Sequence, residues 1–205
     1  MNKFIALTAA SVLSTAEARM SFGLCPEVEN VTTLDKEAYA GKWYQIEQDA
    51  SFPFTMGGSC IFSDYKLDTN GDYDFHFGQY NWFKYSGGGG KMFCPANSKE
   101  TCTATMDGVV GDPVPFPVLS TDYNNYQIGY YCMDMIEGVM KADFIMIYGR
   151  EKYMTAEKIK EVRAIIREKV PEYGYDWVVR SLTGQGPNCE YNQVKTEWEK
   201  WAGKE

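Results

Sequence analysis

The 205-residue sequence contains a single histidine and no excess of positive charge. Because His76 is the only histidine, a metal site built from several histidines is excluded, and there is no second candidate for a histidine base. His76 stands among aspartates in an alternating stretch, so we expect it on the solvent-exposed face of a strand. Lys and Arg number 20 against 28 Asp and Glu, which gives a net charge of −8. Without a basic stripe, nucleic acid is not an expected partner.

The sequence also lacks an apolar run of about 18 residues, the length that a transmembrane helix needs. A shorter apolar run covers residues 4–13, with Lys3 before it and Ala16-Glu17-Ala18 after it. This is the order of regions in a secretory signal peptide. We therefore expect residues 1–18 to be a signal peptide and the protein to be secreted and extracellular. The alternative is a buried N-terminal strand or helix.

No C-x-x-C pair is present, so the cysteines do not indicate zinc binding or redox activity. Their number is even, and in an oxidising compartment three structural disulfides are the default. The residues alone leave many pairings open. Asn30 begins the only N-glycosylation sequon, and we expect it to be glycosylated in a eukaryotic secretory route. The six cysteines are Cys25, Cys60, Cys94, Cys102, Cys132 and Cys189.

Aromatic residues are abundant, with 15 Tyr, 11 Phe and 5 Trp, and they favour strands. Strand-like runs follow one another with turn signals between them, among them an Asn70-Gly71 hairpin. We expect SGGGG (86–90) to be a flexible connection and GDPVPFP (111–117) a rigid extended loop. About eight strands in hairpin succession predict an up-and-down barrel or a sandwich. The predicted strands are residues 43–48, 60–67, 73–83, 91–94, 102–110, 118–119, 126–134 and 144–148.

A helical pattern appears only late in the chain. Thr155 can cap a helix with an apolar stripe from Ile159 to Ile166, and Pro171 ends it. A short ninth strand is predicted at 177–182, and helical spacing of apolar residues returns in the tail. No repeat or linker divides the chain. We expect an N-terminal arm closing the barrel at 19–40, one domain at 41–189 and a helical tail at 190–205.

Three motifs, in order and at fitting spacing, resemble those of the lipocalins. They are GKWYQIE (41–47), TDYNNY (121–126) and FIMIYGR (144–150). The resemblance runs from about Cys25 to Cys189 and is closest to the apolipoprotein D and bilin-binding branch, which shares the NGD hairpin and the Cys-Pro near the mature N-terminus. Each motif alone is weak, but all three with eight strands and a following helix are specific. The resemblance implies an all-β fold, an eight-stranded antiparallel up-and-down barrel (calycin type) with a C-terminal helix packed on its side.

Physical arguments accompany the motifs. An eight-stranded barrel is just wide enough for one small ligand if one end is closed, and Trp43, two residues after Gly41, would close it. Arg150 would reach the barrel floor, where stacking on an indole contributes about 1–2 kcal/mol. Its donors could also bind carbonyls of the loop formed by Thr121, Asp122 and Tyr123. The resemblance further implies the disulfides Cys25–Cys132 and Cys60–Cys189, which leaves Cys94–Cys102 as a bridge outside the branch's four-cysteine pattern.

The cysteine pairing helps to set the faces of the strands. If Cys60 faces outward, alternate residues of its strand face inward, and the same alternation applies to its neighbours. The resulting interior is apolar with a few polar groups, which is typical of a small-ligand pocket. Alternatively, the rings fill the barrel. For the strand at 126–132, either Ile128 and Tyr130 or Gln127 and Tyr131 point inward. The predicted ligand-binding residues are Ile61, Ser63, Tyr65, Leu67, Tyr73, Phe75, Phe77, Gln79, Phe144, Met146 and Tyr148.

Apolar residues also occur in the loops expected at the open end, SFPFTMGGS (51–59), SGGGG, GDPVPFP and MIEGVMK (135–141). Such a rim could contact a membrane or receptor, or fold over the barrel as a lid. We expect a carrier of a small hydrophobic ligand (fatty acid or lipid, sterol, retinoid-like polyene or tetrapyrrole) with no catalytic residues, metal or cofactor. The alternatives are an isomerase with a free cysteine and a ligand-free binding or inhibitory protein acting through its rim. The sequence does not determine the oligomeric state.

Overall fold

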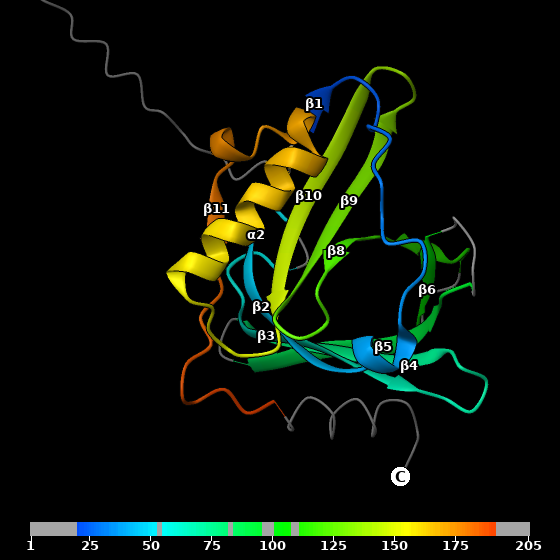
Figure 1. The fold of residues 1–205 in the computed structure, drawn as a ribbon, viewed down its shortest axis with the longest axis vertical. Coiled ribbons are helices and arrows are strands. Elements are labelled where there is room, and N and C mark those ends of the chain that lie inside the picture. Colours follow the sequence, from blue (N-terminus) through cyan, green and yellow to red (C-terminus); the bar gives the residue numbers. More distant parts are fainter. Residues whose placement is uncertain (1–19, 53–54, 82–83, 96–100, 108–110, 192–205) are drawn as a thin grey trace, which may run out of the picture.

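The computed structural model describes residues 20–52, 55–81, 84–95, 101–107 and 111–191 (Figure 1). The expected signal peptide and nearly all of the expected helical tail lie outside these ranges. The strands are β1 (Met20–Phe22), β2 (Gly41–Asp49), β3 (Ser59–Leu67), β4 (Tyr73–Asn81), β5 (Lys84–Phe93), β6 (Cys102–Met106), β7 (Val114–Phe116), β8 (Val118–Thr121), β9 (Tyr126–Ile136), β10 (Met140–Gly149) and β11 (Arg180–Leu182). The helices are α1 (Lys36–Tyr39) and α2 (Ala156–Lys169), followed by the 3₁₀ turns η1 (Pro171–Tyr173) and η2 (Tyr175–Trp177).

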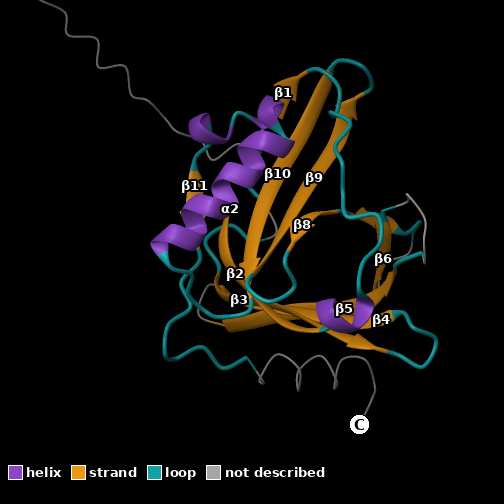
Figure 2. Ribbon diagram, in the orientation of Figure 1, coloured by secondary structure: helices purple, strands orange, loops and turns teal. Residues whose placement is uncertain are grey.

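The strands form an antiparallel barrel, as Figure 2 shows. From β2 the sheet runs through β3, β4, β5 and β6 to β7 in one direction, and through β10 and β9 to β8 in the other. Only Pro117 separates β7 from β8 in the sequence. These two short strands are therefore halves of one strand, the first paired with β6 and the second with β9. Counted in this way, the described strands confirm the eight-stranded barrel with a helix on its side.

Alternation along β10 separates the inside of the barrel from the side that the helix covers. Ile145 and Ile147 pack with Val162 and Ile166 of α2, which lies along this side of the barrel (Figure 1). The Thr155 side chain accepts a hydrogen bond from the amide of Lys158, which is the expected N-cap. The helix prediction is thereby confirmed, and its apolar stripe forms a second core outside the barrel.

The prediction of a flexible connection at 86–90 is wrong, and so is its place in the rim. These residues lie within β5, where Gly88 pairs with Phe77 and Gly90 with Phe75 of β4. A β-carbon on Gly90 would lie 1.8 Å from the carbonyl oxygen of Thr105 on β6. The glycines thus permit a close approach of strands instead of providing a mobile link.

Two other expectations need correction. Residues 114–116 form β7 instead of a loop, and Pro115 is tolerated because the outer edge of this short strand needs no further amide donor. The N-terminal arm contains β1, paired with β10, and the short helix α1. His76 does lie on the outer face, but its side chain is only 16% exposed because it packs edge-on against Phe62 and lies beside Asp64.

Three disulfides join the pairs that the resemblance and the remaining cysteines imply. Cys25–Cys132 ties the N-terminal arm to β9, and Cys60–Cys189 ties β3 to the segment after β11. Cys94–Cys102 bridges the end of β5 and the start of β6. No cysteine is left free.

Candidate functional site

The floor of the barrel is formed by a tryptophan and an arginine that lie far apart in the sequence. The guanidinium carbon of Arg150 lies 3.7 Å from the centroid of the Trp43 ring. Trp43 is fully buried, and its indole nitrogen donates a hydrogen bond of 2.9 Å to the carbonyl of Tyr39 on α1. Strand β2 thus carries the ring inward, and α1 covers it from below.

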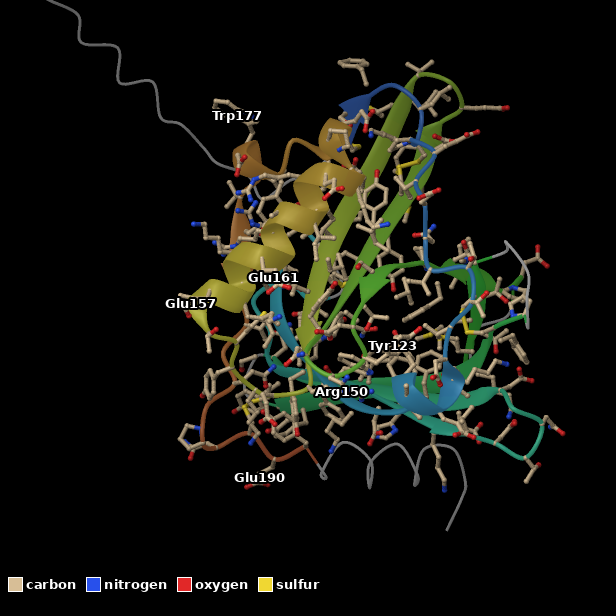
Figure 3. All side chains as sticks on the ribbon, in the orientation of Figure 1. Tyr123, Arg150, Glu157, Glu161, Trp177 and Glu190 are labelled. Carbon is tan, nitrogen blue, oxygen red and sulfur yellow. A yellow bond between two sulfur atoms is a disulfide. The ribbon has the colours of Figure 1, made fainter. Side chains whose placement is uncertain are left out.

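Each nitrogen of Arg150 donates to a backbone carbonyl. Nε binds Tyr123 at 2.9 Å, Nη1 binds Lys42 at 3.2 Å and Nη2 binds Ala38 at 2.6 Å. Figure 3 shows Arg150 and Tyr123 next to each other at this end of the barrel. Burial lowers the pKa of Arg150, but a guanidinium stays charged at neutral pH. The arginine therefore joins β2, α1 and the loop between β8 and β9.

The backbone conformation of Gly41 explains why a glycine stands two residues before Trp43. The Gly41 φ of +95° lies in the region that residues with a side chain rarely adopt. A β-carbon at this position would also lie 3.4 Å from Nη1 of Arg150. That distance is an ordinary van der Waals contact, so the positive φ is the condition that favours glycine at the point where β2 begins.

The loop at 121–125 is held by its own side chains. The Thr121 hydroxyl donates to the carbonyl of Tyr126 and accepts from the amide of Tyr123, which has a φ of +63°. One carboxylate oxygen of Asp122 accepts the amides of Asn124, Asn125 and Tyr126. Burial raises the pKa of Asp122, but these hydrogen bonds outweigh it and the pKa is lowered overall. The loop is thus fixed with the Tyr123 carbonyl turned toward Arg150.

Above the floor, inward-facing side chains of β3, β4 and β10 form one cluster with Trp43 and Tyr39. The Tyr65 ring stacks on Phe75 with centroids 5.9 Å apart. Ser63 lies opposite Trp43 and Phe77 in the sheet. The predicted site residues found together in this cluster are Tyr65, Leu67, Tyr73, Phe75, Phe77 and Tyr148.

The remaining predicted site residues lie farther from the floor. Ile61 and Gln79 both lie beside Gly58, in the loop between β2 and β3. Phe144 packs against Phe52 of that loop, with ring centroids 5.2 Å apart, and the Met146 sulfur accepts a hydrogen bond from the Tyr148 hydroxyl. These four residues share the inner faces of their strands but do not join the cluster above the floor.

For β9, the sequence does not determine which alternating set of side chains faces the inside of the barrel. Ile128 and Tyr130 pack with the α2 core on the outside. Gln127 accepts a hydrogen bond from the hydroxyl of Tyr39, and the Tyr131 ring contacts Phe116 with centroids 6.0 Å apart. Gln127 and Tyr131 therefore face inward.

Sequence reasoning missed several interior residues. Gln45, which follows Trp43 on the same face of β2, and Met92 on β5 could have been found by extending the alternation that located the others. Tyr39 carries no such signal, because it reaches the barrel from a four-residue helix outside the strand pattern.

Four inward-facing aromatic rings keep some solvent exposure. Phe77, Phe116, Tyr131 and Tyr148 all face inward, yet each is only partly buried. Gly88 removes a side chain from the inner face directly opposite Phe77. Incomplete burial of these rings favours an interior with room for a ligand over one that the rings fill.

Among the residues that the structure describes, no group of three or more His, Cys, Asp or Glu side chains is placed to hold a metal ion. In the same ranges, no helix is long and apolar enough to cross a membrane. All six cysteines are in disulfides, so the resting protein offers no free thiol for the isomerase alternative.

An eight-stranded barrel that is closed at one end by a tryptophan and an arginine defines the lipocalin class. The sequence model of the lipocalin / cytosolic fatty-acid binding protein family matches residues 40–180. The chain belongs to this family and falls in its apolipoprotein D and bilin-binding branch.

Two relatives and one solved structure illustrate the similarity. Apolipoprotein D of Mus musculus is 30% identical over 190 residues, which cover 89% of this chain and 93% of the relative. The bilin-binding protein of Pieris brassicae is 31% identical over 144 residues, 66% of this chain and 71% of the relative. The structure of insecticyanin from the tobacco hornworm, Manduca sexta, matches with a TM-score of 0.72 at 20% identity, covering 84% of this chain and 92% of that one. This last likeness concerns the fold alone.

Proposed function

We propose that the protein binds and carries a small hydrophobic molecule inside its barrel. The observation that carries this proposal is the inner wall above Trp43, which is rich in aromatic side chains and still has accessible surface. A closed floor, apolar walls and a few polar groups are what a small-ligand pocket requires. The ligand classes in question are a fatty acid or other lipid, a sterol, a retinoid-like polyene and a tetrapyrrole.

Membership of the lipocalin / cytosolic fatty-acid binding protein family supports this function, as does the printed name of the bilin-binding relative. The ligand-binding role extends to all the inward-facing residues predicted from the sequence, including Ile61, Gln79 and Phe144 near the other end of the barrel. The proposed carrier function requires no catalytic group, because a carrier only has to bind and release its ligand.

Secretion is part of the same proposal. The leader-like residues 1–18 and three disulfides support an oxidising, extracellular environment. Asn30 remains the predicted glycosylation site. It is half-buried, and its amide oxygen is covered, so attachment would depend on access to the amide nitrogen. Peptide mapping of the protein from its own source would locate both the first residue and any glycan.

A matched pair of glycine variants tests binding inside the barrel. Gly88 faces Phe77 on the inner wall, and a β-carbon there would lie 3.2 Å from the ring. Its exposed neighbour Gly87 lies on the opposite face of β5. We expect Gly88→Leu to weaken binding of the neutral fluorescent probe N-phenyl-1-naphthylamine at least about tenfold, because the leucine occupies ligand space, whereas Gly87→Leu leaves it unchanged. Equal affinities in both variants would place the probe outside the barrel and contradict the proposal.

A second contact surface is favoured by the end of the β9–β10 hairpin, which with β1 extends beyond the rest of the barrel (Figure 1). Phe22 there is 89% exposed. We propose that this apolar tip contacts a membrane, or a receptor in its place. Flotation with phosphatidylcholine vesicles should recover the wild-type protein and lose the variant Phe22→Ser/Ile136→Ser; vesicles that recover neither protein would contradict membrane contact. The tip consists of Met20, Phe22, Leu24, Met133, Met135, Ile136 and Val139.

A further inference from the structure

Four tyrosines, here called the tyrosine cluster, meet in the barrel above Trp43. They are Tyr39 of α1, Tyr65 of β3, Tyr131 of β9 and Tyr148 of β10. The rings of Tyr39 and Tyr65 have centroids 5.2 Å apart. In the sheet, Tyr148 lies between Gln45 of β2 and Gln127 of β9, and Gln127 accepts the hydrogen bond of Tyr39. Side chains from one helix and three strands thus bring their polar groups to one level of the barrel.

Two hydroxyls of the tyrosine cluster, those of Tyr148 and Tyr131, have hydrogen-bonding capacity to spare, whereas the Tyr65 hydroxyl already bonds with Ser63, Tyr39 and Gln127. The Tyr148 hydroxyl contacts Nε2 of Gln45 at 3.5 Å and the sulfur of Met146 at 3.6 Å, both long for a hydrogen bond. The Tyr131 hydroxyl makes no hydrogen bond to any residue that the structure describes. Burial raises the pKa of all four tyrosines, and their mutual proximity raises it further in Tyr39, Tyr65 and Tyr131. At neutral pH they are therefore uncharged donors that can also accept.

The charges of the surrounding strands are kept away from this level. Glu47 of β2 points outward to Arg163 and Arg180. On β10, Lys141 and Asp143 pair with each other at 3.0 Å on the outer face.

Arg150 is the cation at the floor of the barrel. It lies against the ring of Trp43, and each of its nitrogens is already bonded to a backbone carbonyl. The polar groups that a ligand would meet are consequently neutral hydroxyls and amides.

We propose that the buried end of the ligand is an uncharged hydroxyl or carbonyl group, held by Tyr131 and Tyr148, instead of a carboxylate. This inference rests on the proposed carrier function. A carboxylate taken out of water without a cation loses far more solvation than neutral hydroxyls return. A hydroxyl or carbonyl can instead use the spare donors of the cluster. The site therefore selects alcohols, ketones, aldehydes or esters over acids with the same hydrocarbon skeleton.

Three retinoids with one polyene skeleton provide the test. Retinol and methyl retinoate are neutral, and retinoic acid is ionised at about pH 7.5. We expect both neutral compounds to bind at least about tenfold more tightly than retinoate in calorimetric titrations, because only the acid has to bury a charge. Retinoate binding as tightly as retinol would overturn this inference while leaving the carrier function in place. Failure of all three compounds to bind would overturn both.

Tyrosine variants locate the effect. Tyr131→Phe and Tyr148→Phe each remove one interior hydroxyl and no ring, and Tyr80→Phe is the matched control on the outer face, where Tyr80 packs against Tyr85. We expect the two interior variants to weaken retinol binding about 3- to 10-fold, the range of one lost hydrogen bond, and the control to leave it unchanged. Unchanged retinol affinity in both interior variants would overturn the assignment of these hydroxyls.

Discussion

The hydroxyl of Tyr173 donates a hydrogen bond of 2.7 Å to the buried carboxylate of Asp49, joining the turn after α2 to strand β2. Glu47 lies two residues before Asp49 on the same face of β2. It is 2% exposed and contacts Arg163 of α2, Tyr175 of η2 and Arg180 of β11. The outer face of β2 is therefore a polar anchor for the helix and the C-terminal strand, beside the apolar core that α2 forms with β10.

Glu47→Gln should lower the free energy of unfolding by about 2–3 kcal/mol. The amide keeps the shape but leaves two arginines without their anion, and the loss falls below that of a fully buried pair because Arg163 is about one third exposed. Urea denaturation measures this value. Glu161→Gln is the control, since Glu161 lies on the exposed face of α2 (Figure 3) and its pair with Lys158 should contribute less than about 0.5 kcal/mol. Equal losses in the two variants would contradict the anchor.

Trp43→Ala should destabilise the protein by about 3–5 kcal/mol, because it removes a fully buried ring and the surface on which Arg150 stacks. Trp177 is 92% exposed, and Trp177→Ala should change stability by no more than about 0.5 kcal/mol. Both values come from the same urea titrations. A small effect at Trp43 would show that the ring does not close the barrel.

The disulfides should differ in their contributions. Cys60 and Cys189 are 129 residues apart, and in a chain-entropy estimate their bond contributes about 5 kcal/mol. Cys94 and Cys102 are 8 residues apart, and the same estimate gives about 2.5 kcal/mol. Replacing each pair by alanines and comparing midpoints of thermal unfolding tests the order. A larger loss from the short bridge would show that strain or native contacts outweigh chain entropy.

Asp122 makes the stability of the floor loop dependent on pH. Its carboxyl pKa is lower in the folded protein than in the unfolded chain, so the folded state gains stability above the ordinary carboxyl pKa and loses it as the pH falls through the lowered value. Wild type should exceed Asp122→Asn in unfolding free energy at about pH 6, and this difference should shrink toward about pH 3. A difference that stays constant with pH would exclude the carboxylate charge as its source.

Period-two alternation explains why so much of the interior could be predicted. On β3, β4 and β10 one known orientation determines every other residue, so Tyr65, Phe75 and Tyr148 were placed from the sequence alone. The pairing of Trp43 with Arg150 came from the family motifs, because residues 107 positions apart along the chain carry no local signal of contact.

The errors have a different physical origin. Residues 86–90 look flexible by intrinsic preference, but pairing with β4 and the close approach of Thr105 override that preference. Pro117 divides one barrel strand into two. From the local sequence pattern alone, this region is predicted as a loop followed by a short strand. Tyr39 enters the site through α1, whose place beneath the barrel is set by tertiary contacts such as the bond from Arg150 to Ala38.

The proposed carrier function of the barrel is tested most directly by native mass spectrometry of the protein purified from its own source. We expect the native mass to exceed the mass of the same preparation after denaturation by roughly a few hundred daltons, the size of a pocket-filling molecule. A bare chain in every preparation, which also takes up no retinol or N-phenyl-1-naphthylamine when these are added, would contradict the account.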